Sequence, residues 1–258
     1  MKKILLVGAN SYIANMFIKY IDKEEQNILI DKVSASDGKW RDMDLCQYDV
    51  IVMLAAIVHV KEKKILEECY MQVNYELPIE VAIKAKQSKV RHFVFFSTAA
   101  VYGSKVTRIT AQTAIKPDTI YGYSKMQAEK RLVELQTEEY KITILRPPMV
   151  YGEGCKGNYS RLIKLAKING VYPLIHNKRS IVHIETLCKF LYEVIEYEKE
   201  GIFFPQDNEY ADTIMIIKGL RDDMGKKTLF IPGVAWLVKI FMRYSKTIRK
   251  MFGNWYFE

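Results

Sequence analysis

Tyr121 and Lys125 are the residues in this chain whose types and spacing could perform chemistry. Side chains four residues apart on a helix lie on the same face, one turn from each other. A free phenol has a pKa of about 10 and is a poor base at neutral pH, but a fixed ammonium nearby favours the phenolate. The two residues could therefore form an acid/base pair, or they could be an ordinary surface pair. The chain has seventeen tyrosines, so the spacing alone does not decide between these interpretations.

The first residues of the chain predict the start of a dinucleotide-binding unit. A short apolar run over residues 3–7 is typical of a buried strand, and apolar residues recur at helical spacing between 12 and 22. Gly8 stands between the two. In such a unit the N-terminus of the helix faces a pyrophosphate. Ser11 and Ala14 replace the usual second and third glycines, so a glycine turn of any other α/β protein is an alternative interpretation.

The ends of the next strands are expected to face the rest of the cofactor. Asp31 follows the glycine turn by about 20 residues, where a ribose ligand is expected. Ser34 competes for this role if the strand runs on through Val33, and Lys32 could instead favour a 2′-phosphate. The sequence therefore leaves NAD and NADP open. Beside the adenine we expect Asp44 and Leu45, and beside the cofactor backbone the small residues Ala55 and Ala56.

The order of the remaining elements predicts the fold class. Further strands are expected at residues 28–30, 49–54, 92–97, 142–145 and 181–184, and further helices at 70–86, 121–140, 159–169 and 185–197. Strands that alternate with helices at this spacing need parallel crossovers. Residues 1–150 are therefore expected to form an α/β domain with a Rossmann-type doubly wound parallel sheet. The texture changes after Pro147 and Pro148, and residues 151–258 are expected to form a smaller C-terminal substrate lobe.

Composition excludes several other classes of protein. The chain has 258 residues and a net charge of +9, and no apolar run reaches the roughly 18 residues of a membrane span. Its four cysteines are widely spaced with no C-x-x-C pair, which argues against a disulfide framework and against a metal site and indicates a cytoplasmic protein. No nucleic-acid motif is present, and the basic residues are not interleaved with aromatics as in a single-strand platform, so no nucleic-acid partner is expected.

The positive charge is concentrated near the C-terminus. Residues 218–250 hold nine Lys or Arg and two Asp. A single helix is expected over residues 235–251, with basic side chains on one face and apolar ones on the other, namely Leu237, Phe241, Tyr244, Ile248 and Met251. Such a helix could make a peripheral contact with an anionic membrane, or it could pack on its own domain with a solvated lysine face.

Three motifs follow one another in the chain. They are Ser97-Thr98-Ala99-Ala100-Val101-Tyr102-Gly103 at a strand end, Tyr121-x-x-x-Lys125, and Arg146-Pro147-Pro148-Met149-Val150-Tyr151-Gly152. Together with the glycine turn, this set resembles the extended short-chain dehydrogenase/reductase superfamily, specifically the NAD-dependent epimerase/dehydratase (nucleotide-sugar epimerase) family. The resemblance extends from residue 3 to about residue 210.

The resemblance implies a role for each matching residue. Thr98 would bond the substrate hydroxyl, Tyr121 would be the acid/base on that hydroxyl, and Lys125 would bond the nicotinamide ribose and hold Tyr121 as phenolate. The reaction would remove a proton from a sugar C4 hydroxyl and transfer a hydride to NAD, or the reverse. The substrate would be a UDP-sugar. Asn158 and Arg179 would bind its diphosphate, and Thr98 and Tyr121 would bind its sugar hydroxyl. The expected cofactor-binding residues are Gly8, Asn10, Ser11, Tyr12, Ile13, Asp31, Asp44, Leu45, Leu54, Ala55, Ala56, Asn74, Ser97, Tyr121, Lys125 and Pro148.

The resemblance also limits the reaction. Family dehydratases need an acid pair where this chain has Ala99 and Ala100, so dehydration is not expected. A 4-epimerase of a UDP-hexose or UDP-N-acetylhexosamine in surface-polysaccharide biosynthesis is favoured, for example a UDP-glucose 4-epimerase. A 4-reductase of a UDP-4-keto sugar and a dinucleotide-binding protein without turnover stay open. His59 and His183 are expected to be packed residues rather than catalysts, and a homodimer is implied by the family alone.

Overall fold

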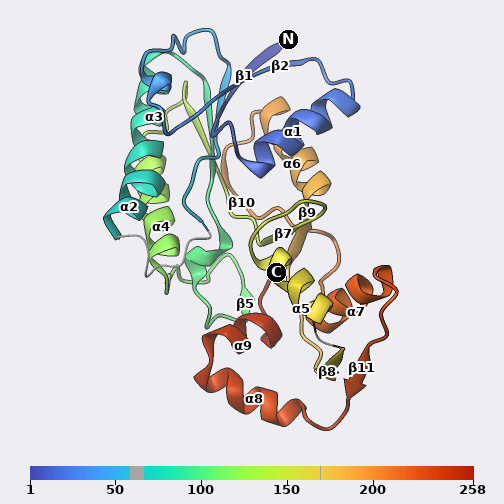
Figure 1. Ribbon diagram of the computed structural model, residues 1–258. Helices are drawn as coiled ribbons and strands as arrows, with labels where there is room; N and C mark the ends of the chain where they lie inside the picture. Colours follow the sequence, from blue (N-terminus) through green and yellow to red (C-terminus); the bar gives the residue numbers. More distant parts are fainter. Residues whose placement is uncertain (59–66, 169) are drawn as a thin grey trace.

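The computed structural model describes residues 1–58, 67–168 and 170–258 (Figure 1). Its centre is a six-stranded, wholly parallel sheet in the order β10-β6-β4-β3-β1-β2. The strands are β1 (Lys2–Val7), β2 (Ile28–Val33), β3 (Val50–Met53), β4 (His92–Phe96), β6 (Lys141–Leu145) and β10 (Gly201–Phe203). The expected Rossmann-type parallel sheet is therefore confirmed.

Helices cover both faces of this sheet. On one face lie α1 (Tyr12–Lys23) and α6 (Ile184–Glu196), and on the other α3 (Leu77–Gln87) and α4 (Ile120–Val133) with the short α2 (Glu67–Met71) (Figure 1). Successive strand residues point to opposite faces, which divides the core in two. Leu5 and Val7 pack in the cluster with α3 and α4, whereas Ile4 and Leu6 pack in the cluster with α1 and α6. Continuous apolar strands are what a sheet covered on both sides requires.

The second part of the chain forms smaller units around α5 (Asn158–Ile168) and α7 (Thr213–Asp223). Three two-stranded parallel pairs join them: β7 (Met149–Tyr151) with β9 (Ile181–His183), β8 (Val171–Pro173) with β11 (Leu229–Ile231), and β5 (Arg108–Ile109) with β12 (Tyr256–Phe257). Residues 184–203 belong to the central sheet and its helices instead of to a separate lobe, because α6 packs beside α1 and β10 pairs with β6. The boundary expected at residue 150 therefore does not divide the fold cleanly.

Two predicted helices differ from what the sequence suggested: one ends earlier and the other is broken in two. Helix α4 stops at Val133, not at residue 140, because residues 137–140 form a turn. This turn buries Tyr140, whose hydroxyl donates a hydrogen bond to the carbonyl oxygen of Ala82. The predicted tail helix is broken at Ser245, whose φ and ψ of −113° and 112° are extended. It consists of α8 (Ala235–Tyr244) and α9 (Lys246–Phe252), and the hydroxyl of Ser245 caps α9 by accepting a hydrogen bond from Ile248 N.

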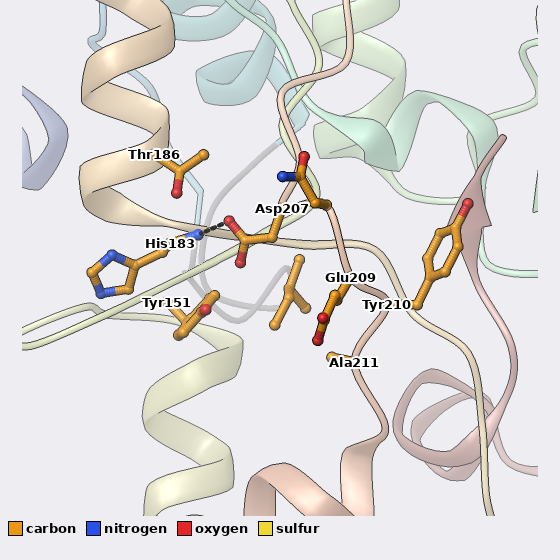
Figure 2. Close-up of a pocket in the computed structure, with 9 residues that line it drawn as sticks. Tyr151, His183, Thr186, Asp207, Glu209, Tyr210 and Ala211 are labelled. Carbon is orange, nitrogen blue, oxygen red and sulfur yellow. Dashed lines mark hydrogen bonds between the residues drawn. The ribbon is translucent and has the colours of Figure 1, made fainter.

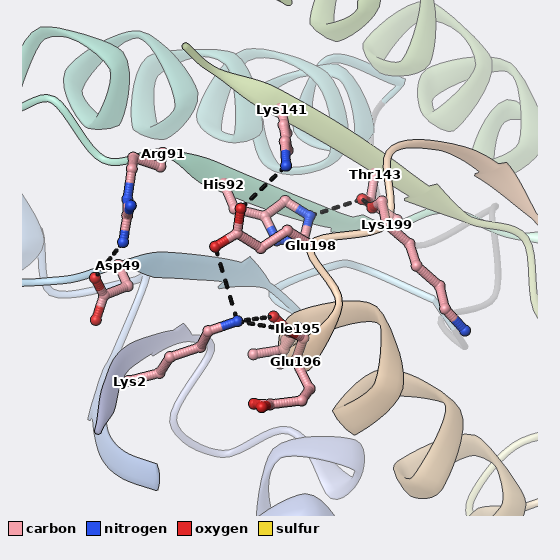
Figure 3. A network of polar contacts seen from close by, with 10 residues as sticks. All are labelled: Lys2, Asp49, Arg91, His92, Lys141, Thr143, Ile195, Glu196, Glu198 and Lys199. Carbon is pink, nitrogen blue, oxygen red and sulfur yellow. Dashed lines mark hydrogen bonds and ion pairs between the residues drawn. The ribbon is translucent and has the colours of Figure 1, made fainter. Parts of the chain in front are cut away.

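A network of charged side chains closes the amino-terminal edge of the sheet (Figure 3). Glu198 lies between Lys141 Nζ and Lys2 Nζ at 3.0 and 3.8 Å. Beneath this network His92 is buried in β4, and its Nε2 lies 2.8 Å from the hydroxyl of Thr143. Burial lowers the pKa of His92 to about 4. The imidazole is therefore neutral in the folded protein at physiological pH.

This lowered pKa predicts a loss of stability in mild acid. A histidine in the unfolded chain has a pKa of about 6.5, so below that pH the unfolded chain takes up a proton that folded His92 refuses. The contribution of His92 is complete above pH 6.5 and is lost as the pH falls towards 4. Between pH 7 and pH 5 the loss amounts to about 2 kcal/mol. His92→Gln keeps a polar partner for Thr143 and should remove this part of the pH dependence, measured by urea unfolding at both pH values. Equal losses in both proteins would contradict the assignment.

Candidate active site

The candidate site lies at the carboxyl edge of the parallel strands, where β4 ends and Ser97 and Thr98 follow it. A short 3₁₀ turn, η4 (Ala99–Tyr102), follows at once. Thr98 begins this turn, and its hydroxyl accepts a hydrogen bond of 3.1 Å from Ala100 N. The threonine side chain is thereby fixed beside the end of the strand.

Tyr121 lies in the first turn of α4. Thr119 caps this helix, with its hydroxyl accepting from Gly122 N at 3.1 Å. The side chain of Thr98 lies close enough to the phenol to lower its pKa and so favour the phenolate. The N-terminal end of a helix also favours negative charge. The structure thus brings together Thr98 and Tyr121, which the sequence places 23 residues apart.

Gly122 allows α4 to approach η4 closely enough for this contact. A Cβ on Gly122 would lie 2.7 Å from the carbonyl oxygen of Ala100, a backbone atom that cannot swing aside. Any larger residue would push the start of α4 away from the turn that carries Thr98. The motif therefore needs glycine for packing, which its spacing did not reveal.

Lys125 lies one turn further along α4 and is fully buried. Its Nζ donates a hydrogen bond of 2.7 Å to the carbonyl oxygen of Phe96 and lies 4.4 Å from the ring centre of Phe95. Burial lowers the pKa of Lys125 to about 7 and raises the pKa of Tyr121 to about 12. We expected the Lys125 ammonium to lower the pKa of Tyr121. In this structure the pKa is raised instead, because the effect of burial is larger than the opposing effect of Thr98.

A buried polar cluster that the sequence analysis missed stands behind these residues. The Glu129 carboxylate accepts hydrogen bonds from Arg146 Nε at 3.0 Å and from Arg146 Nη2 at 2.6 Å. It also accepts one from the hydroxyl of Ser97. The remaining Arg146 nitrogen, Nη1, donates to the hydroxyl of Tyr102 at 2.6 Å. Glu129 follows Lys125 by four residues and so shares its face of α4. That spacing was the one available signal, because the arginine comes from the end of another strand.

The glycine turn fits a dinucleotide. Gly8 has a φ of +122°, and a Cβ there would lie 2.8 Å from Ala55 N, so only glycine permits this approach to the end of β3. Ser11 caps α1 by accepting from Ala14 N at 3.5 Å, and the first turn of α1 carries no acidic residue. The helix N-terminus is free of carboxylates that would repel a pyrophosphate. Tyr12 reaches across to the carbonyl oxygen of Glu153 at 2.7 Å.

The structure does not support Asp31 as the ribose ligand. Strand β2 runs on through Val33, so Asp31 lies within it, and its carboxylate accepts from Tyr48 at 2.9 Å and pairs with Lys3 at 3.3 Å. Ser34, just past the strand end, is the better candidate. Leu45 is also unsuited to contact adenine through its side chain, which is buried in the core.

Some of the other predicted cofactor residues are exposed, and others are buried with partners inside the fold. Asp44 is exposed and accepts hydrogen bonds from Cys46. Asn74 is completely buried in a π-helical segment (Gln72–Glu76), where it bonds the backbone of Ile57 and the hydroxyl of Ser124. It therefore ties the segment after β3 to α4. His59, which we expected to be a packed residue, lies outside the described residues. Of the remaining predicted cofactor residues, Leu54 is buried in the core and Ile13 packs against it, whereas Asn10 is exposed and Ala56 and Pro148 are half-buried.

The two predicted diphosphate ligands lie in the second part of the chain. Asn158 is exposed at the start of α5. Arg179 donates through Nη1 to the carbonyl oxygens of Lys250 at 2.7 Å and Gly253 at 3.2 Å, both at the end of α9. Burial lowers the pKa of Arg179 to about 10, which still leaves it charged at neutral pH. The arginine is thus committed in part to the C-terminal segment.

A pocket of about 560 Å³ lies in the second part of the chain (Figure 2). Its lining includes Tyr151, His183, Asp207 and Ala211, and Ala211 pairs with the backbone of Arg179. Asp207 accepts from His183 N at 3.0 Å. None of the predicted catalytic residues lines this pocket. His183 caps α6 by accepting from Glu185 N at 3.4 Å, which agrees with a structural role.

Comparison with known proteins identifies the family. The NAD dependent epimerase/dehydratase family matches residues 4–203. UDP-glucose 4-epimerase of Vibrio cholerae is 27% identical, over 93% of this chain and 81% of the relative. N-acetyl-alpha-D-glucosaminyl-diphospho-ditrans,octacis-undecaprenol 4-epimerase of Escherichia coli O157:H7 is 26% identical, over 73% of this chain and 61% of that relative.

Solved structures agree with this assignment at the level of the fold. UDP-glucuronic acid 4-epimerase from Bacillus cereus, solved in complex with NAD, superposes with a TM-score of 0.71 over 89% of this chain and 87% of that one, at 21% identity. The family match covers well over half of the chain, and the motifs at the carboxyl edge lie within it. The chain belongs to the NAD-dependent epimerase/dehydratase family of the extended short-chain dehydrogenase/reductase type.

Proposed function

We propose that this protein is a sugar 4-epimerase that uses NAD and acts on a UDP-hexose or UDP-N-acetylhexosamine, such as UDP-glucose, in surface-polysaccharide biosynthesis. The observation that carries the proposal is the placement of Thr98, at the start of η4, beside Tyr121, in the first turn of α4, at the carboxyl edge of the sheet. It brings two hydroxyl groups to one point, as catalysis at a substrate hydroxyl requires.

The proposed chemistry needs one proton and one hydride to leave the sugar together. Tyr121 would take the proton of the C4 hydroxyl while Thr98 holds its oxygen, and later Tyr121 would return the proton. NAD, which Gly8 and Ser11 at the glycine turn would help to hold, would supply a reversible acceptor for the C4 hydride. Since burial raises the pKa of Tyr121 to about 12, taking this proton would require positive charge beside the phenol, which bound NAD would bring.

The substrate class rests on what the named relatives share. Both the UDP-sugar of the Vibrio cholerae enzyme and the undecaprenol-linked sugar of the Escherichia coli enzyme carry a diphosphate, as their names state, and both enzymes are 4-epimerases. Arg179 and Asn158 are our candidates for binding a diphosphate in this chain. An arginine fork suits phosphate oxygens, and Arg179 stays charged at neutral pH.

Two further features belong to the proposal. We propose a homodimer, on family grounds, and a cytoplasmic location, in keeping with four cysteines that form no disulfide. The part of the chain that the structure describes has no helix long and apolar enough to span a membrane. NADP replaces NAD in this proposal if a 2′-phosphate is bound by Lys32, whose Nζ lies 3.4 Å from Asn15 Oδ1 in this structure.

A turnover assay with UDP-glucose, UDP-N-acetylglucosamine and their 4-keto derivatives tests the function. An epimerase should convert the first two to their C4 epimers without net use of NAD, and a deuterium at C4 should be retained because the same hydride returns. Stoichiometric NADPH consumption with a 4-keto sugar would instead establish a reductase. Dinucleotide binding without turnover of any of these compounds would contradict both enzymes and establish a binding protein.

Tyr121→Phe tests the acid/base assignment. Loss of the phenolic hydroxyl should lower kcat roughly 100- to 10,000-fold and leave NAD affinity nearly unchanged, measured by turnover and by dinucleotide titration. Tyr123→Phe is the matched control, because this tyrosine lies two residues later, is 40% exposed and accepts a hydrogen bond from Gln127 at its hydroxyl. A Tyr121→Phe variant with more than about a tenth of the wild-type rate would sink the assignment.

Gly122→Ala tests whether the close approach of α4 to η4 positions Tyr121. The added Cβ meets the Ala100 carbonyl oxygen, so the free energy of unfolding should fall by about 1–3 kcal/mol. The rate should fall roughly tenfold or more, because the phenol is displaced from Thr98. Gly219→Ala in α7 is the control: a Cβ there meets nothing within 4 Å, and alanine should stabilise the helix by up to about 1 kcal/mol. Equal effects at both glycines would rule out the packing argument.

A further inference from the structure

Helix α8 exposes apolar side chains that a helix packed on its own domain would bury. None of its ten residues is buried. Trp236, Ile240 and Tyr244 follow one another four residues apart and so share a face, and they are 60%, 43% and 84% exposed. Leu237 and Phe241 extend the same apolar surface at 38% and 54% exposure. We call these five residues the α8 apolar face.

The position of α8 is nevertheless fixed. Figure 1 shows it at the end of the molecule that is remote from the sheet. Arg249 of α9 reaches back and donates to the last carbonyl oxygens of α8, from Nε to Met242 at 2.9 Å and from Nη2 to Arg243 at 3.2 Å. The helix is therefore held by its end and by a half-buried edge that includes Val238, while the α8 apolar face points away.

Between Asp223 and Glu258 the charges of the segment that carries this face have one sign. Residues 224–257 contain seven Lys or Arg and no Asp or Glu. Two of these cations, Lys239 and Arg243, lie on α8 itself, one residue before Ile240 and Tyr244. Both are exposed, and neither side chain has a hydrogen bond or ion pair within the described part of the chain. Exposed apolar residues with unpaired cations beside them fit an anionic, apolar partner.

We propose that α8 docks this protein on the surface of an anionic lipid bilayer, with the α8 apolar face among the acyl chains and Lys239 and Arg243 at the headgroups. A helix of ten residues is about 15 Å long, half of the roughly 30 Å hydrocarbon core, so it lies in the plane of the interface. Trp236 and Tyr244, near its two ends, are residue types that favour this interface. A second copy of the chain fits less well, because a two-fold contact would set cations against cations.

The docked helix would be connected to the second part of the site. Helix α9 follows α8 directly, and its last carbonyl oxygens hold Arg179. Arg179 in turn pairs with Ala211, which lines the 560 Å³ pocket. A bilayer bound by α8 would thus lie one helix away from the residue proposed to bind the substrate diphosphate.

Vesicle co-sedimentation of the full chain tests the docking. The protein should sediment with vesicles of phosphatidylcholine and phosphatidylglycerol, much less with phosphatidylcholine alone, and less again in high salt. Lys239→Gln and Arg243→Gln should each weaken binding about fivefold, the equivalent of about 1 kcal/mol for each charge. Trp236→Ser combined with Phe241→Ser should abolish it. Lys19→Gln on α1 and Tyr197→Ser, at a tyrosine that is 70% exposed after α6, are the matched controls and should bind as the wild type does.

Several outcomes would overturn the proposal. They are failure to bind either vesicle, equal binding to neutral and anionic vesicles, and equal losses in the control variants. Self-association without lipid that Trp236→Ser removes would assign the face to a second copy instead. Turnover of a water-soluble UDP-sugar without vesicles is measured in parallel on every variant. An active enzyme that does not bind vesicles refutes only the docking, and a vesicle-binding protein without turnover refutes only the proposed function.

Discussion

The buried ion pair between Glu129 and Arg146 is the interaction on which the arrangement of the site depends. Both side chains are at most 5% exposed, and charges buried this deeply are tolerated only when their hydrogen-bonding groups are satisfied. The carboxylate accepts hydrogen bonds from Ser97 and from two guanidinium nitrogens, and the guanidinium also donates one to Tyr102. A pair of this kind adds little net stability, but the loss of one partner costs about 3–5 kcal/mol. The network therefore selects one arrangement of the ends of β4 and β6, of η4 and of α4.

The same burial sets the protonation of the two catalytic candidates. It works against both charged forms, raising the pKa of Tyr121 to about 12 and lowering that of Lys125 to about 7. Two groups partly restore the charged forms: Thr98 for the phenolate and Glu129 for the ammonium. A phenol in this environment holds its proton unless positive charge is added near it, whereas Lys125 loses its proton close to neutral pH. Proton transfer by Tyr121 would then respond to whatever charge the bound substrate and cofactor bring.

The sequence predicted the elements whose periodicity is long or repeated and missed those that depend on distant partners. Five of the six central strands and the helices that cover them followed from apolar runs and helical spacing. Strand β10 was not predicted, because three residues carry no period, and it is recognisable only by its pairing with β6. Thr98, Tyr121 and Lys125 were chosen from motifs, yet Glu129 was not, since nothing in α4 shows that Arg146 will arrive beside it. Asp31 was preferred to Ser34 because the end of β2 could not be located to within three residues.

The C-terminal segment links the remote end of the molecule to the candidate site. After α9 the chain passes Arg179, then β12 pairs with β5, and Trp255 Nε1 donates to the carbonyl oxygen of Gly103 at 3.2 Å. Phe257 is buried against Tyr102, whose hydroxyl holds Arg146. Covalent and packed neighbours therefore connect α8 and α9 to the network around Glu129. This continuity explains how a helix that buries none of its own residues can still belong to the folded unit: its fixed end is part of the structure that positions Thr98 and Tyr121.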